Sequence, residues 1–149
     1  MARIYTTKRQ QIVAALVTKL KTINGTGDFL TNLNNNVVGR LLFWDEVDEF
    51  PAVHINAGTE TRLYQGGGYK DRFLTITLRC YVNSEDAALD LDKLLEDVET
   101  VLETNSNLSY TDKQGAAQEV KQISIVSIDT DEGVLAPLGV GEVLLEVQY

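Results

Sequence analysis

Cysteine and histidine are almost absent from the sequence, which contains one of each, Cys80 and His54, in 149 residues. A single cysteine excludes an internal disulfide, and nothing in the sequence points to an oxidising compartment. Metal sites and catalytic triads generally need more histidine or cysteine than this chain has. Cys80 lies within an apolar alternation, where a cysteine is usually a small core residue. We therefore expect a protein that is not an enzyme and that binds no metal or cofactor.

Basic residues are also scarce, with 13 lysines and arginines against 22 acidic residues and a net charge of −9. Proteins that grip nucleic acid by its phosphates need clustered Lys and Arg, so we expect no specific DNA binding, although DNA could slide past such a protein. No apolar run approaches the roughly 20 residues that cross a bilayer, so we expect no membrane partner. The first residues, MARIYTTKRQQ, are charged and lack the apolar segment of a signal peptide.

Two amphipathic helices are predicted. The first spans about Thr7 to Ile23, with Thr7 and Gln10 as a capping box. Its apolar residues share one face: Ile12, Leu16, Leu20 and Ile23. The second spans about Glu85 to Glu103, with Ser84 as its N-cap. We expect its acidic residues to form a solvated face: Asp90, Asp92, Glu96, Asp97, Glu99 and Glu103.

Apolar alternation predicts several strands between and after the helices. These are Arg40 to Trp44, Pro51 to Ala57, Thr59 to Gln65, Phe73 to Val82, Ile123 to Asp129 and Glu142 to Tyr149. Short connections favour antiparallel pairing, with Gly66 to Gly68 at the tip of an extended β-hairpin. The order of elements predicts an α+β fold in a single domain, residues 1–149, in which a mixed, mostly antiparallel β-sheet is flanked by two α-helices.

Three connecting segments are predicted to be loops. Thr26 to Gly39 is polar and asparagine-rich, and loops of this length are often functional or ordered by a partner. A polar connector follows the second helix. The segment 133-GVLAPLGVG-141 is apolar but interrupted by Gly and Pro, so we expect it to pack on its own domain or on a neighbouring protein.

Three stretches resemble chemical motifs but do not meet their requirements. Gly66 to Gly68 is followed by a strand, whereas a phosphate-binding P-loop needs a Lys-Ser/Thr pair and a helix. Asp129 to Gly133 starts like a calcium loop, but its glycine and glutamate spacing is wrong for an EF-hand. Asp45 to Glu49 is rich in carboxylates that could serve acid–base chemistry or a cation, yet no partner completes a site, which favours an exposed acidic turn.

Beyond the first helix, the chain contains a series of distinctive phrases. They are 42-LFWDEVDEFPAV-53, 58-GTETR-62, 74-LTITLRCYV-82, 95-LEDVETVL-102 and 134-VLAPLGVGEVLLEVQY-149, with the glycine-rich hairpin among them. Together with the N-terminal helix, they resemble the tail terminator (tail completion) proteins of long-tailed bacteriophages. The resemblance implies a fold in which a sheet is flanked by helices. It also implies that the protein belongs to the tail or neck of the virion and is assembled in the host cytoplasm. It also implies a homohexameric ring that ends tail-tube polymerisation and joins the head.

The partners implied by the resemblance are further copies of the chain, the tail tube protein and a head-completion or connector protein, with genomic DNA passing through unbound. A net charge of −9 suits such a repulsive channel. The hairpin tip and the apolar loop are the candidate subunit or partner interfaces, and their candidate residues are Tyr64, Gln65, Gly66, Gly67, Gly68, Tyr69, Leu135, Pro137 and Leu138. Two alternatives remain open: another head–tail connector or neck protein of the same particle, and a small acidic regulatory or ligand-binding domain of a cell.

Overall fold

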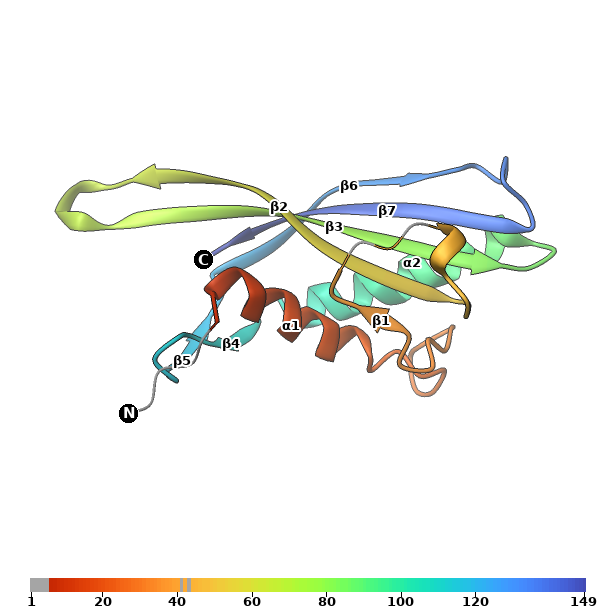
Figure 1. Ribbon diagram of the computed structural model, residues 1–149, viewed down its shortest axis with the longest axis horizontal. Helices are drawn as coiled ribbons and strands as arrows, with labels where there is room; N and C mark the ends of the chain where they lie inside the picture. Colours follow the sequence, from red (N-terminus) through yellow and green to blue (C-terminus); the bar gives the residue numbers. More distant parts are fainter. Residues whose placement is uncertain (1–5, 41, 43) are drawn as a thin grey trace.

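The computed structural model describes residues 6–40, 42 and 44–149 of the chain. Two helices lie on one side of a long, twisted β-sheet (Figure 1). The helices are α1 (Lys8–Leu20) and α2 (Ala87–Thr104). The strands are β1 (Val37–Val38), β2 (Ala52–Tyr64), β3 (Lys70–Asn83), β4 (Ser109–Thr111), β5 (Ala117–Glu119), β6 (Gln122–Thr130) and β7 (Leu138–Gln148). The fold is α+β, as the sequence predicts.

The main sheet has five strands in the order β1-β2-β3-β7-β6. β1 pairs with β2 in parallel and the remaining neighbours are antiparallel, which confirms the mixed, mostly antiparallel prediction. β4 and β5 form a separate two-stranded sheet. β7 pairs with β3 as far as Phe73. Beyond that point β2 and β3 continue as a two-stranded arm, residues 63–71, which projects from the sheet (Figure 1). The extended hairpin is therefore confirmed.

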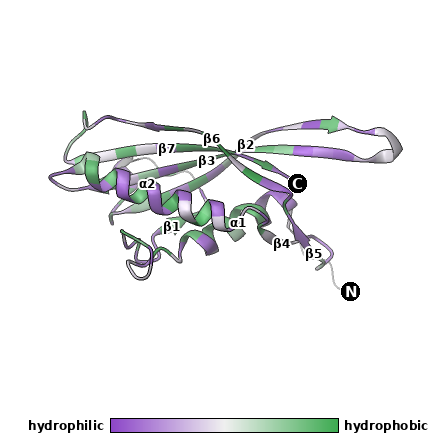
Figure 2. Ribbon diagram, turned by 180° about the vertical axis from the view of Figure 1, so that it is seen from behind, coloured by the Kyte–Doolittle hydropathy of each residue, from purple (hydrophilic) through white to green (hydrophobic). Residues whose placement is uncertain are grey.

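The core lies between the sheet and the two helices. Hydrophobic and hydrophilic residues alternate along the strands and along α2 (Figure 2), so one face of each element is apolar. β3 buries Leu74, Ile76, Leu78, Cys80 and Val82, as its alternation predicts. The helices bury Ile12, Leu16, Leu20, Leu91, Leu94, Leu95 and Val98. Each fully buried aliphatic side chain stabilises the fold by about 1.5–3 kcal/mol, so this layer supplies most of the driving force.

The two helices begin differently. The capping box of α1 is confirmed, because the Gln10 N–H donates to Thr7 Oγ1 at 3.1 Å. The cap predicted for the second helix is wrong: α2 starts at Ala87, and Asp86 occupies the N-cap position without a side-chain hydrogen bond. Ser84 instead donates its backbone N–H to the Pro137 carbonyl at 2.9 Å. The backbone of Ser84 is thus bound to the segment before β7, and Ser84 lies outside the helix.

Asp97 contradicts the prediction of a fully solvated acidic face on α2. Its side chain is turned toward the segment before β1, and the residue is 1% exposed. Its carboxylate accepts hydrogen bonds from the Leu30 N–H at 2.9 Å, from the Thr31 N–H at 2.7 Å and from the Thr31 hydroxyl. Several donors compensate for the lost hydration of a buried carboxylate. Asp97 therefore pins the 26–36 segment to α2.

Several loop and strand boundaries also differ from the predictions. The Thr26 to Gly39 segment contains β1 and buries Leu33 and Val37, so it is partly core. The polar connector after α2 forms the β4–β5 hairpin. Gly58 does not end a strand, because β2 continues through a bulge between Ala57 and Glu60. In the predicted strand Arg40 to Trp44, residues 41 and 43 lie outside the described residues, and a 3-10 turn, η1 (Trp44–Glu46), begins at its end.

The apolar loop is shorter than predicted because Leu138 to Gly141 belong to β7. Gly139 explains why a glycine-rich stretch can be a strand here. A Cβ atom at this position would lie 2.6 Å from Val82 Cγ2 and 3.2 Å from the Ala87 carbonyl oxygen. The glycine thus lets β7 pass close to the start of α2. The exposed part of the loop is reduced to residues 131–137.

The role of Asp97 can be tested with the nearly isosteric substitution Asp97→Asn. The amide presents one acceptor oxygen and no charge, so at least one donor from the 30–31 segment loses its partner. We expect the free energy of unfolding in urea to fall by about 2 kcal/mol. Asp92→Asn, on the exposed side of the same helix, is the matched control and should change stability little. Equal stability of the two variants would show that Asp97 does not anchor the segment.

Candidate protein interfaces

The tip of the arm is a tight turn between β2 and β3. The Gln65 N–H donates to the Tyr69 carbonyl at 2.7 Å and closes the turn. Gly67 and Gly68 have φ angles of 76° and 83°, in the left-handed region that favours glycine. Two of the three glycines are thus required by the backbone of the turn itself.

The side chains around this turn are unusually exposed for their type. Tyr64 is 69% exposed, Tyr69 is 75% exposed and Leu63 is 54% exposed. Tyrosine is an apolar ring with a polar tip, and it is enriched among residues that anchor protein interfaces. The arm therefore presents two exposed tyrosine rings at the end of a projecting hairpin, a geometry suited to a contact with another protein.

The second candidate interface is the loop at residues 131–137. Val134 is 82% exposed and Leu135 is 50% exposed, while Pro137 is also exposed. The Asp131 carboxylate accepts a hydrogen bond from the Leu135 N–H at 3.1 Å, so the loop has its own internal support. Leu138 is half-buried at the start of β7. Of the predicted residues in this segment, Leu135 and Pro137 form the apolar surface. Val134, which was not predicted, also belongs to it.

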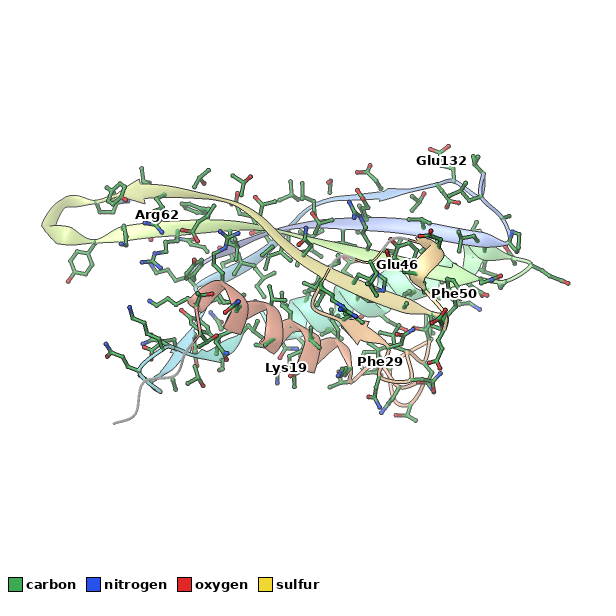
Figure 3. All side chains as sticks on the ribbon, in the orientation of Figure 1. Lys19, Phe29, Glu46, Phe50, Arg62 and Glu132 are labelled. Atoms are coloured by element: carbon green, nitrogen blue, oxygen red, sulfur yellow. The ribbon has the colours of Figure 1, made fainter. Side chains whose placement is uncertain are left out.

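The structure places the two candidate interfaces at opposite ends of the sheet. Leu138 pairs with Asn83 at one end of β3, and the arm lies at the other. β3 has 14 residues, and an antiparallel strand rises about 3.4 Å per residue, so the ends are roughly 45 Å apart. In Figure 3, Arg62, next to the arm, and Glu132, in the loop, lie on opposite sides of the molecule. The predicted residues therefore form two separate surfaces.

The base of the arm is held by a polar cluster that sequence reasoning missed. The Tyr149 hydroxyl donates to the Glu60 carboxylate, and Arg62 Nε lies 2.8 Å from Glu60 Oε2. Arg72 lies over the Tyr149 ring, 5.5 Å from its centroid. Burial by itself would raise the pKa of Glu60, but the hydrogen bonds from Tyr149 and Arg62 outweigh it and lower that pKa. Tyr149 is far from the other three residues in sequence, and no local pattern indicates that it meets them.

The residues considered for chemistry do not assemble into a reactive centre. His54 is 2% exposed and lies against Tyr81, with ring centroids 5.1 Å apart and ring planes tilted by 51°. Burial lowers the pKa of His54. The carboxylates of Asp45, Glu46, Asp48 and Glu49 are exposed. Within residues 6–40, 42 and 44–149, no group of three His, Cys, Asp or Glu side chains is placed to hold a metal ion. None of the described helices is both long and apolar enough to span a membrane.

The described residues form an α+β fold with two exposed apolar surfaces at opposite ends of the main sheet. The same overall fold occurs in a solved chain of the virion of the native gene transfer agent (GTA) particle, with a TM-score of 0.58 and 9% sequence identity over 94% of this chain and 95% of that one.

The chain belongs to the bacteriophage tail tube terminator proteins, whose family model matches residues 6–149. A relative, the tail tube terminator protein p142 of Escherichia phage T5, is 34% identical over 149 residues, covering 95% of this chain and 92% of that protein. The resemblance found in the sequence is thereby confirmed, and the protein is a structural component of a phage tail.

The burial of Cys80 makes a simple prediction about its reactivity. Burial raises the pKa of its thiol to about 12, and the thiolate is the reactive form. At pH 8 we expect a disulfide reagent such as DTNB to label the folded protein at least roughly a thousandfold more slowly than an exposed thiol. The variant Leu89→Cys, at a half-exposed position of α2, is the positive control. Rapid labelling of the unmodified folded protein would contradict the buried placement.

Proposed function

We propose that the protein forms a homo-oligomeric ring, most simply a hexamer, on the head-proximal end of a phage tail tube. The ring ends tube polymerisation and provides the surface that joins the head. The observation that supports this most strongly is the placement of two exposed apolar surfaces at opposite ends of one sheet, in a chain of the tail tube terminator family. A terminator needs one surface for the tube and another for the head side.

In this proposal the projecting arm is a contact with a protein neighbour, and the 131–137 loop is the contact at the other end. The partners are further copies of the chain, the tail tube protein and a head-completion or connector protein. The protein acts in the tail or neck of the virion, after assembly in the host cytoplasm, and is not an enzyme. The excess of 22 acidic over 13 basic residues suits a conduit through which genomic DNA passes without being held.

Membership of the terminator family favours this proposal over the two alternatives considered for the sequence. A different connector or neck protein would need the same kind of surfaces but would bind away from the tube. An acidic regulatory domain of a cell would have no place in a particle. The position of the protein relative to the tail tube is therefore the decisive observable.

The ring and its location can be tested together. We expect native mass spectrometry of the concentrated protein, or of a tube-bound form, to show a closed oligomer of six copies. We also expect antibody labelling in electron micrographs of purified particles to mark the junction of tail and head. A strict monomer that is also absent from purified particles would overturn the proposal.

The role of the arm can be tested with the double substitution Tyr64→Ser and Tyr69→Ser. Both side chains are exposed, so the circular dichroism spectrum should be unchanged. Truncating aromatic anchors at an interface typically costs about 2 kcal/mol or more each, so ring formation or tube capping should weaken by roughly a hundredfold or more. Leu89→Ser, at an exposed position away from the arm, is the matched control. If the double variant still assembles and still caps tubes of normal length, the arm is not the contact.

A further inference from the structure

The main sheet has an open edge on each side. β1 pairs with β2 at Val53 and His54, and from Ile55 onward no strand of the described ranges pairs with that edge of β2. β6 is the terminal strand on the other side. An unpaired edge presents free N–H and C=O groups and is a template for pairing with another chain. The two open edges therefore need an explanation in a protein that assembles.

The directions of the strands make the two edges complementary. β2, β3, β7 and β6 are antiparallel in succession, so β2 and β6 run in opposite directions. If one copy is rotated about an axis roughly along the strands, its β2 comes beside β6 of the next copy in antiparallel orientation. Such a head-to-tail contact uses two different surfaces, and it is the kind that closes into a ring. Antiparallel pairing would then continue across each junction.

The β6 edge carries apolar side chains that a solvated edge does not need. Val126 is 58% exposed and lies at the bulge between Ile125 and Ser127. Ile128 is 41% exposed and pairs with the buried Val143, so it stands on the face of the sheet that the helices cover. A neighbouring strand paired with this edge would cover part of the Ile128 side chain, which is favourable in proportion to the apolar area covered.

The β2 edge has a hollow on that same face. The hollow has a volume of about 670 Å³ and lies between α1 and β2, with apolar lining from Val13, Ala14, Val17 and Ala57. Gly39 borders it, where a Cβ would come within 3.2 Å of Val13 Cγ1. Because the hollow and Ile128 lie on the same face, a neighbouring β6 paired with β2 would direct Ile128 toward the hollow.

The charges beside the two edges also match. Arg9 lines the hollow next to β2 and donates to the Gly58 carbonyl in the bulge of β2. Glu99 and Glu103 of α2 lie beside Ile123 and Ile125 at the β6 edge. A charged side chain and a bulge both discourage indiscriminate edge pairing. A neighbouring copy would bring Glu99 and Glu103 close to Arg9. An ion pair between them would allow the edges of two copies of this chain to pair.

We propose that copies of the chain join by pairing the open edge of β2 with β6 of the neighbouring copy, with Ile128 packed against the α1 hollow. The sheets then form one continuous antiparallel sheet around the ring. The arm and the 131–137 loop project from the two rims, where they are free to contact the tube and the head side. This inference rests on the proposed ring and specifies its subunit interface.

Engineered disulfides across the junction provide the test. Each variant carries one cysteine on β2 and one on β6, both on the face of the sheet turned away from the helices. The four pairs combine Asn56→Cys or Thr61→Cys with Ser124→Cys or Ser127→Cys. Disulfides form where Cα atoms come within about 4.4–6.8 Å, so the four pairs sample the possible registers. In ring-forming protein or purified particles, we expect at least one pair to give a ladder of cross-linked copies on non-reducing gels. Moving the β2 cysteine to Thr77 on the central strand β3 is the control, and it should abolish the ladder.

A second variant tests the interface without cross-linking. Ile128→Asp places a charge where the neighbour's hollow should lie, and at 41% exposure it should leave the fold intact by circular dichroism. We expect its assembly to weaken at least a hundredfold, whereas Leu89→Asp, at an exposed position of α2, should leave ring closure unchanged. Rings that form normally with Ile128→Asp and give no ladder with any cysteine pair would overturn the β2–β6 interface while leaving the proposed function standing. A chain that forms no ring even in particles would overturn both.

Discussion

The pairing of β3 with a neighbour on each side is the constraint on which the rest of the structure depends. β2 lies along one edge of β3 and β7 along the other, and the inner face of all three strands packs under the helices. β3 extends beyond the last residue that pairs with β7. This end of β3 pairs only with β2, and the two strands form the arm. The other end of β3 pairs with Leu138 and so positions the 131–137 loop. One strand therefore sets the distance and direction between the two exposed surfaces.

Two carboxylates, one buried and one half-buried, complete this arrangement by holding the irregular segments. Asp97 holds the segment before β1, and through β1 the start of β2. At the opposite end, Glu60 receives the Tyr149 hydroxyl and so connects the base of the arm to the chain terminus. A carboxylate with several donors is well suited to this, because losing one partner leaves a desolvated charge. Hydrogen bonds to carboxylates thus hold the segments near both exposed surfaces, whereas apolar packing stabilises the core.

In the proposed assembly, surfaces of different kinds have different tasks. The two ends of the sheet carry isolated apolar or aromatic side chains on short segments, which suits contacts with other tail and head proteins. The two edges carry free backbone groups, which suits repeated contacts between identical copies, because edge pairing in a ring satisfies every subunit in the same way. An elongated sheet with open edges and exposed ends separates these tasks in space.

The sequence alone determined the local elements whose patterns are strong. The 3.6-residue period and capping box predicted α1, and the alternation from Leu74 to Val82 predicted β3 and its buried face. The exposed glycine turn with its tyrosines was also predictable, because the turn is local. Only the tertiary structure decided the fate of residues whose partners are distant. From the sequence, Asp97 is predicted to be one more exposed acidic residue of α2, but in the structure it binds the 30–31 segment. Glu60 and Tyr149 are in contact although they are 89 positions apart in sequence. From the sequence, Gly139 is predicted to interrupt a loop. In the structure it lies in a strand, where Val82 and Ala87 leave no room for a side chain. Local patterns report the conformation of a segment, whereas burial, pairing and open edges depend on which segments the fold brings together.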